Sequence, residues 1–189
     1  MTRVLILYGT CEGQTARIAE YIAQVIRGRG SEAHPVDIMG AGPLHLGDYD
    51  GVIVGASVHM GKHETYVRDF VRKHRDALAR HPSAFFSVSL AAHDDTESAR
   101  EEVEGYIERF MHDTDWHPGK VGAFAGALLY TRYGFFKRWM MKKIAGSKGS
   151  PDTDTARDYI YTDWAGVEHF AEEFLDSLVP EDARATSRG

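Results

Sequence analysis

The sequence predicts a single α/β domain in which helices cover both faces of a five-stranded parallel sheet. Short apolar runs alternate with amphipathic stretches, a pattern typical of strands joined by right-handed helical crossovers. The 189 residues, 43% hydrophobic and 26% charged, fit one globular domain and are short for two. The single cysteine excludes an intramolecular disulfide, and the net charge of −6 argues against general nucleic-acid binding.

Five segments have the composition of strands. Residues 4–8 are a continuous apolar run rich in branched side chains, as expected for a strand buried on both faces. Residues 32–38 form a weaker strand, and Pro35 indicates an edge position because proline donates no ladder hydrogen bond. The remaining predicted strands are 49–55, 84–90 and 120–127.

Four amphipathic stretches predict helices, because their apolar side chains recur at the spacing of one helical face. They are a helix with Ile18, Ile22 and Ile26 that ends at Gly28, a helix with Tyr66, Phe70 and Val71, and helices over 97–111 and 163–178. Residues 1–179 are expected to form the domain, with 180–189 as a disordered polar tail. No run of about 20 apolar residues is present, so no membrane-spanning helix is predicted.

The loop after the first strand has the residues of a phosphate site. Thr10, Gly13 and Thr15 lie at the start of a helix, whose first N–H groups lack partners and whose dipole favours an anion. The two hydroxyls can donate to phosphate oxygens, and Gly13 allows close approach of the backbone. The loop lacks the lysine of a Walker motif and the glycine pattern of a dinucleotide fingerprint. A plain capped turn is the alternative interpretation.

The same loop contains Cys11, whose thiol a helix N-terminus would activate. We prefer a simpler role, in which the backbone amide of Cys11 binds the ligand, because the sequence offers no resolving partner for the thiol. His112, His117 and the other histidines lack the spacing of metal ligands, so no metal site is predicted.

Further sequence motifs, spread over nearly the whole chain, resemble those of the flavodoxin superfamily. Within this superfamily they are most similar to the menaquinone-dependent protoporphyrinogen oxidases of bacteria. They are Gly13-Gln14-Thr15, Gly55-Ala56-Ser57 and residues 82–88, 126–133, 153–155 and 161–164. The resemblance implies a three-layer flavodoxin-like fold with strand order 2-1-3-4-5. It also implies FMN as cofactor, oxidation of protoporphyrinogen IX to protoporphyrin IX in haem synthesis, and a membrane quinone (menaquinone) as electron acceptor.

The resemblance places the FMN phosphate on residues 10–15 and the isoalloxazine ring between the loops 56–61 and 89–93. The implied cofactor-binding residues are Thr10, Cys11, Glu12, Gly13, Gln14, Thr15, Ala56, Ser57, Val58, His59, Met60, Gly61, Ser89, Leu90, Ala91, Ala92 and His93. Neither ring loop has the aromatic residue that covers the flavin in electron-carrier flavodoxins, which leaves room for a flat substrate. His59 and His93 are candidate proton shuttles or donors to the ring, and solvent-facing or structural roles are the alternative.

The segment 132–150 after the fifth strand is rich in basic and aromatic residues, with no acid over 132–148. As an amphipathic helix it would suit an anionic lipid surface, and its arginines would suit the propionates of a porphyrinogen. A core-packing helix with a solvated basic face is the alternative. The candidate substrate or membrane residues are Arg132, Lys137, Arg138, Trp139 and Lys142.

Together these features predict an FMN-dependent protoporphyrinogen oxidase, cytoplasmic and peripheral on the cell membrane, with homo-oligomer formation left open. The flavin carries the redox chemistry, so no catalytic triad or acid–base dyad is required. Three alternatives stay open: a soluble flavodoxin-type electron carrier, an NAD(P)H-dependent quinone reductase, and a flavodoxin-like scaffold without FMN. The missing ring-covering aromatics and the basic segment count against the electron carrier.

Overall fold

A computed structural model describes residues 1–129 and 158–178 and contains the predicted alternation of strands and helices. The strands are β1 (Arg3–Gly9), β2 (Glu32–Asp37), β3 (Gly51–His59), β4 (Lys62–His63), β5 (Ser83–Ser89), β6 (Lys120–Ala125), β7 (Ala127–Leu129) and β8 (Asp158–Ile160). The α-helices are α1 (Gln14–Gly28), α2 (Thr65–Leu78), α3 (Glu97–Thr114) and α5 (Trp164–Leu178). Short 3-10 turns are η1 (Ile38–Gly40), η2 (Leu46–Asp48) and η3 (Ala91–His93).

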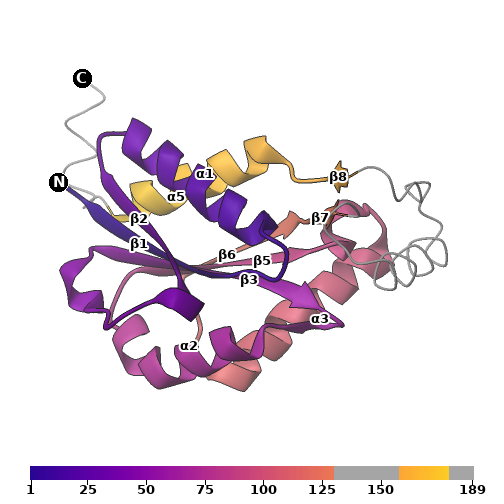
Figure 1. Ribbon diagram of the computed structural model, residues 1–189, viewed down its shortest axis with the longest axis horizontal. Coiled ribbons are helices and arrows are strands. Elements are labelled where there is room, and N and C mark those ends of the chain that lie inside the picture. The colour runs from indigo at the N-terminus through magenta and orange to yellow at the C-terminus, as the bar shows by residue number, and fades with distance from the viewer. Residues whose placement is uncertain (130–157, 179–189) are drawn as a thin grey trace.

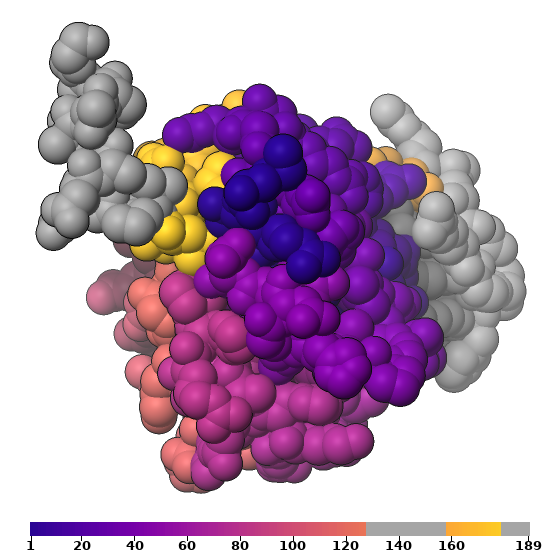
Figure 2. Space-filling view, turned by 90° about the vertical axis from the view of Figure 1, so that its left-hand side faces the viewer, coloured from indigo at the N-terminus to yellow at the C-terminus, as the bar shows by residue number. Residues whose placement is uncertain are grey.

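The main sheet has the order β2-β1-β3-β5-β6, and all of these neighbours are parallel. This confirms the predicted order 2-1-3-4-5, because β5 and β6 are the predicted fourth and fifth strands. Helices α1 and α5 cover one face of the sheet, and α2 and α3 cover the other (Figure 1). Figure 2 looks onto the end from which β1 starts, where the N-terminal residues lie at the surface.

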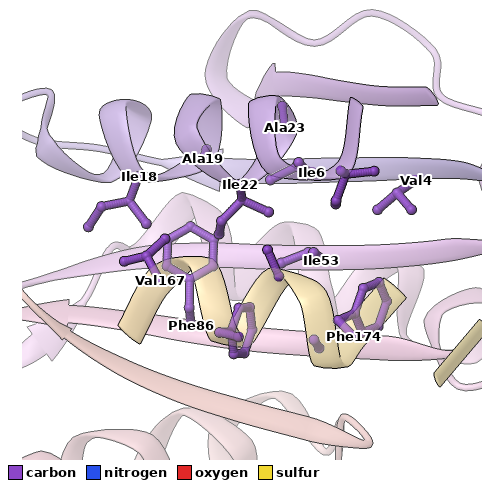
Figure 3. Packing of buried hydrophobic residues seen from close by; sticks show 14 of the residues in the cluster. Val4, Ile6, Ile18, Ala19, Ile22, Ala23, Ile53, Phe86, Val167 and Phe174 are labelled. Carbon is purple, nitrogen blue, oxygen red and sulfur yellow. The ribbon is translucent and has the colours of Figure 1, made fainter. Parts of the chain in front are cut away.

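Successive side chains of each strand point to opposite faces of the sheet, which divides the core into two layers. Ile6, Ile53 and Phe86 face α1 and α5, where they pack against apolar side chains of both helices (Figure 3). The neighbouring residues point to the opposite face, and among them Val54 and Phe85 pack against α2 and α3. All five side chains are fully buried. A strand whose residues are apolar on both faces therefore lies between two layers of helices, as the continuous apolar runs predict.

One predicted boundary is wrong at the end of β3. The expected loop 56–61 begins as strand, because β3 continues to His59 and then turns back through Met60 and Gly61 into β4. Both turn residues have positive φ, 50° and 78°, as in the two-residue hairpin turns that match the twist of paired strands. Methionine rarely adopts this conformation, so the local sequence gives no warning of the turn.

The predicted fifth strand also ends early. The main-sheet strand stops at Ala125 rather than at residue 127, and after Gly126 the chain continues as β7. The carbonyl of Gly126 accepts a hydrogen bond from the N–H of Tyr161 at 3.2 Å, and Ala127 pairs with Ile160 of β8. The chain therefore leaves the parallel sheet to form a separate antiparallel pair, the β7–β8 ribbon.

Two predictions fall outside the described residues. They concern the basic segment 132–150, with Arg132, Lys137, Arg138, Trp139 and Lys142, and the tail 180–189. Within residues 1–129 and 158–178, no helix combines the length and apolar character needed to cross a membrane.

Candidate functional site

A solvent-open cleft lies at the carboxyl ends of the central strands. Its walls come from the loop between β1 and α1, the end of β3, the end of β5 and the junction of β6 with β7. The lining residues are Cys11, Glu12, Gln14, Thr15, Ser57, Val58, His59, Val88, Ser89, Leu90, Gly126 and Ala127. From β1 the chain crosses to β2 on one side and returns to β3 on the other, so the cleft lies at the switch point where α/β sheets bind ligands.

About half of the predicted cofactor residues line this cleft, and the others do not. Ala56 is fully buried and packs toward α2, because its side chain points to the other face of β3. Met60 is 88% exposed at the tip of the hairpin. The predicted residues His59 and His93 separate: His59 lines the cleft, whereas His93 in η3 packs against the Tyr161 ring at 4.2 Å between centroids.

Thr10, Gly13, Gly61, Ala91 and Ala92 are not among the residues that line the cleft. Sequence reasoning missed Val88, Gly126 and Ala127 as lining residues. Their position in the sequence could have identified them, because each lies at the carboxyl end of a predicted strand, where ligands approach.

The start of α1 presents N–H groups without intrahelical partners to the cleft. Gly13, with φ 92°, caps α1 without a side-chain hydrogen bond, and its own N–H donates to Thr10 Oγ1 at 2.8 Å. The first intrahelical bond runs from the Arg17 N–H to the Gly13 carbonyl, so the preceding N–H groups of the helix have no intrahelical partner. The Thr10 N–H donates to the Tyr66 hydroxyl at 3.0 Å, which ties the loop to α2.

Two buried polar atoms beside these donors test the fit of FMN. Thr15 is 1% exposed and its Oγ1 has no hydrogen-bond partner in the described part of the chain. Gln14 is 5% exposed and its Oε1 is likewise unpaired there. An orphaned buried hydroxyl costs about 1–3 kcal/mol. At a helix N-terminus with no side-chain cap and no acid in its first turn, Thr15 and the N–H groups that lack intrahelical partners fit a phosphate.

The ring side of the cleft is held by short polar contacts and lined by small or aliphatic side chains. Ser57 donates to Glu64 at 3.3 Å, and the Ala92 N–H donates to Ser89 Oγ at 3.3 Å. Leu90, 37% exposed, flanks the opening. No aromatic side chain is among the lining residues within 1–129 and 158–178, as expected from the two ring loops.

A third group of polar atoms gathers at the mouth of the cleft. One ligand atom each from Cys11, Glu12 and His59 lies within 4.8 Å of the other two. A thiol, a carboxylate and an imidazole are suitable ligands for zinc, although the spacing of these residues along the chain does not indicate a site. All three also line the cleft, so a metal there would compete for the space that the cofactor fills.

His63, which the β3–β4 turn returns to the interior, lies between β5 and α3. It is 4% exposed, and its Nε2 lies 2.8 Å from Ser87 Oγ. The rings of Phe85 and Phe110 meet it edge to face at 5.4 and 5.1 Å. Burial, together with the nearby charge of Arg68, lowers the pKa of His63 to about 4.

We expect His63 to make the folded protein sensitive to mild acid. Its pKa is lower in the folded state than in the unfolded state, so its contribution is complete above about pH 6.5 and is lost as pH falls toward 4. The loss amounts to about 3 kcal/mol of unfolding free energy over that window. Urea unfolding at pH 7, 5.5 and 4.5 measures it, with His63→Gln as the control that cannot titrate. Equal pH dependence of the two proteins would contradict the prediction.

With this geometry established, comparison with known proteins assigns the family. The family model described as a flavodoxin domain matches residues 5–155. The chain belongs to the flavodoxin-domain family. It is 36% identical over 171 residues to protoporphyrinogen IX dehydrogenase (quinone) of Escherichia coli strain K12, covering 90% of this chain and 93% of that protein. A Leishmania major protein of the same name is 36% identical over 189 residues, 98% of this chain and 80% of its own.

Solved structures of this family share the fold. Flavodoxin 1 from Bacillus cereus superimposes with a TM-score of 0.56 at 17% identity, over 94% of this chain and all of that one. A short-chain flavodoxin associated with a bacterial microcompartment gives a TM-score of 0.58 at 13% identity, over 95% and 100% of the two chains. The predictions of a flavodoxin-like fold and of FMN as cofactor are confirmed.

Proposed function

We propose that this protein is an FMN-dependent oxidoreductase that converts protoporphyrinogen IX into protoporphyrin IX in haem biosynthesis and reduces a quinone, menaquinone, in return. The observation that carries the proposal is the match, along nearly the whole chain, to two relatives from distant organisms that both bear the name protoporphyrinogen IX dehydrogenase (quinone). Each porphyrinogen loses six electrons and six protons, and three quinone molecules take them up to become three quinols.

The residues that line the cleft support this proposal because they would leave the flavin ring accessible to a flat substrate. FMN, when bound, supplies the electron acceptor. The α1 N-terminus and Thr15 would bind the phosphate, while Val58, Val88 and Ala127 would form apolar walls around the ring. Among the described residues that line the cleft, Leu90 has the largest side chain, which would leave a flat tetrapyrrole or quinone access to the ring. A carrier that only exchanges electrons with a protein partner has no need of that access.

His59 is the lining residue suited to proton transfer. Oxidation of a porphyrinogen releases protons, and the imidazole of His59 can accept one at a ring nitrogen and donate it again. Its position on the cleft wall favours this role over His93, which packs against Tyr161. His59 is therefore our candidate for the proton shuttle.

The segment 132–150 is proposed to bring the protein to a membrane quinone. Its basic side chains suit the anionic cytoplasmic face of the cell membrane, and Trp139 suits the interface between lipid and water. The candidates Arg132, Lys137, Arg138 and Lys142 also suit porphyrinogen propionates. We therefore propose a peripheral enzyme that meets both substrates at the membrane surface.

Turnover of protoporphyrinogen IX by the FMN-loaded protein is the direct test. We expect anaerobic porphyrin formation, followed by fluorescence, to depend on a menaquinone analogue and to exceed the non-enzymatic rate by at least about tenfold. No acceleration despite stoichiometric FMN would overturn the proposal. Turnover driven by NADPH with a quinone would point to a reductase instead, and rapid electron exchange with a redox protein alone would point to a carrier.

A further inference from the structure

A buried chain of hydrogen bonds joins the cofactor loop to the segment that precedes α5. The Gln14 amide Nε2 donates to Thr162 Oγ1 at 2.8 Å, and Thr162 Oγ1 donates to the carbonyl of Ala125 at 2.8 Å. Gln14 is 5% exposed and Thr162 is 8% exposed, so solvent does not compete for these bonds. The contact spans 148 positions of the sequence and connects α1 to the end of β6.

The direction of this chain is fixed by its last member. A carbonyl oxygen only accepts, so the Thr162 hydroxyl must donate its proton to Ala125. Its oxygen is then left to accept from Gln14, which must present its NH₂ group to Thr162. The Gln14 Oε1 atom is consequently turned away from Thr162, and it is the buried acceptor that has no partner among the described residues.

The unpaired oxygen belongs to a side chain that lines the cleft. A buried acceptor without a donor is costly, and a ligand that brings an O–H or N–H group removes the cost. An anionic phosphate oxygen cannot do so, because it also only accepts. Gln14 therefore complements Thr15 and the helix N–H groups, which offer donors to the phosphate.

We propose that Thr162 is a positioning residue of the cofactor site, which orients Gln14 so that its Oε1 accepts a hydrogen bond from a hydroxyl or N–H group of FMN. The inference rests on FMN binding and not on the substrate proposed above, so failure of porphyrinogen turnover leaves it standing.

The same residue ties the cofactor site to the β7–β8 ribbon. Thr162 directly follows Tyr161, whose N–H donates to the Gly126 carbonyl at 3.2 Å, and Gly126 in turn donates to Ser89 at 3.0 Å. Both strands of the ribbon are thus anchored at one end, beside Gly126, which lines the cleft. Because coupling between binding and local stability is reciprocal, FMN should stabilise this anchor as much as the anchor favours FMN.

Substitution of Thr162 tests the proposal through affinity. We expect Thr162→Val to raise the Kd for FMN by about tenfold, while Thr162→Ser, which keeps the hydroxyl, stays within about twofold of the wild type. In a Gln14→Met background the Thr162→Val change should have almost no further effect, because Thr162 acts through Gln14. Additive losses in the double variant, or unchanged affinity in Thr162→Val, would overturn the proposal.

Hydrogen exchange provides a second measurement that does not depend on activity. FMN should slow exchange of the Tyr161 amide in the wild type and in Thr162→Ser, but much less in Thr162→Val. Thermal unfolding of each apoprotein checks that the variants fold. Equal protection by FMN in Thr162→Val and the wild type would show that Thr162 does not link the two sites.

Discussion

Replacing Thr15 by valine is expected to weaken FMN binding by about ten- to a hundredfold while making the apoprotein more stable. The hydroxyl of Thr15 is buried and unpaired in the described part of the chain. It therefore lowers the stability of the protein until a ligand accepts a hydrogen bond from it. A bond from this hydroxyl to a phosphate oxygen is charge-assisted and correspondingly strong. The two effects have opposite signs because the unpaired Thr15 hydroxyl destabilises the protein without FMN and stabilises the complex when it donates a hydrogen bond to FMN.

Fluorescence titration with FMN and urea unfolding of the apoprotein measure the two effects separately. We expect a gain of about 1 kcal/mol in the unfolding free energy of Thr15→Val without FMN. Thr96→Val is the matched control, because the Thr96 hydroxyl accepts from the Ala99 N–H as the N-cap of α3, away from the cleft. That control should lose about 1 kcal/mol of stability and keep its FMN affinity. Unchanged affinity in Thr15→Val would mean that Thr15 does not contact the phosphate.

Gly55→Ala is expected to lower the unfolding free energy by at least about 3 kcal/mol. A Cβ atom at Gly55 would lie 2.0 Å from the tip of the Phe86 ring, with two further ring atoms within 2.5 Å. Phe86 is the β5 partner of Gly55 in the sheet and is fully buried against α1 and α5, so the ring cannot move aside cheaply. The ring covers the glycine, and β3 has no room for a side chain there.

Thermal and urea unfolding measure this loss, and two variants isolate its cause. Gly105→Ala is the control, because a Cβ at this position of α3 meets nothing within 4 Å, and it should stabilise the protein by about 0.5–1 kcal/mol. If the clash with Phe86 is the cause, Phe86→Leu should recover part of the loss when combined with Gly55→Ala. A Gly55→Ala protein as stable as the wild type would contradict the packing described here.

The helical layers on both faces of the sheet could be predicted because their signals are local and repeated, whereas the strand order followed from the resemblance to flavodoxins. The apolar run at the start of the chain, followed by the amphipathic pattern of Ile18, Ile22 and Ile26, determines a buried strand and a helix with one apolar face. The alternation of such units leaves few topologies once crossovers are right-handed. The cofactor loop followed from the same logic, because its position after the first strand places it at the carboxyl edge.

Bends in the chain that depend on a few dihedral angles were not predictable. The turn at Met60 and Gly61 needs two consecutive positive φ values, and methionine carries no sequence signal for that conformation. Likewise β6 ends at Ala125 because Gly126 pairs with Tyr161, a residue 35 positions further along the chain. Such ends are decided by competition between partners for the same backbone groups.

The sequence by itself determined the fold class, the strand order, the cofactor loop and the lack of ring-covering aromatics in the two flanking loops. Only the tertiary structure brought Thr162 to Gln14, enclosed His63 between Phe85 and Phe110, and separated His59 from His93. The physical reason is that periodic burial follows from the spacing of apolar residues within one segment. The partner of a buried polar atom depends instead on packing between segments that are distant in the chain.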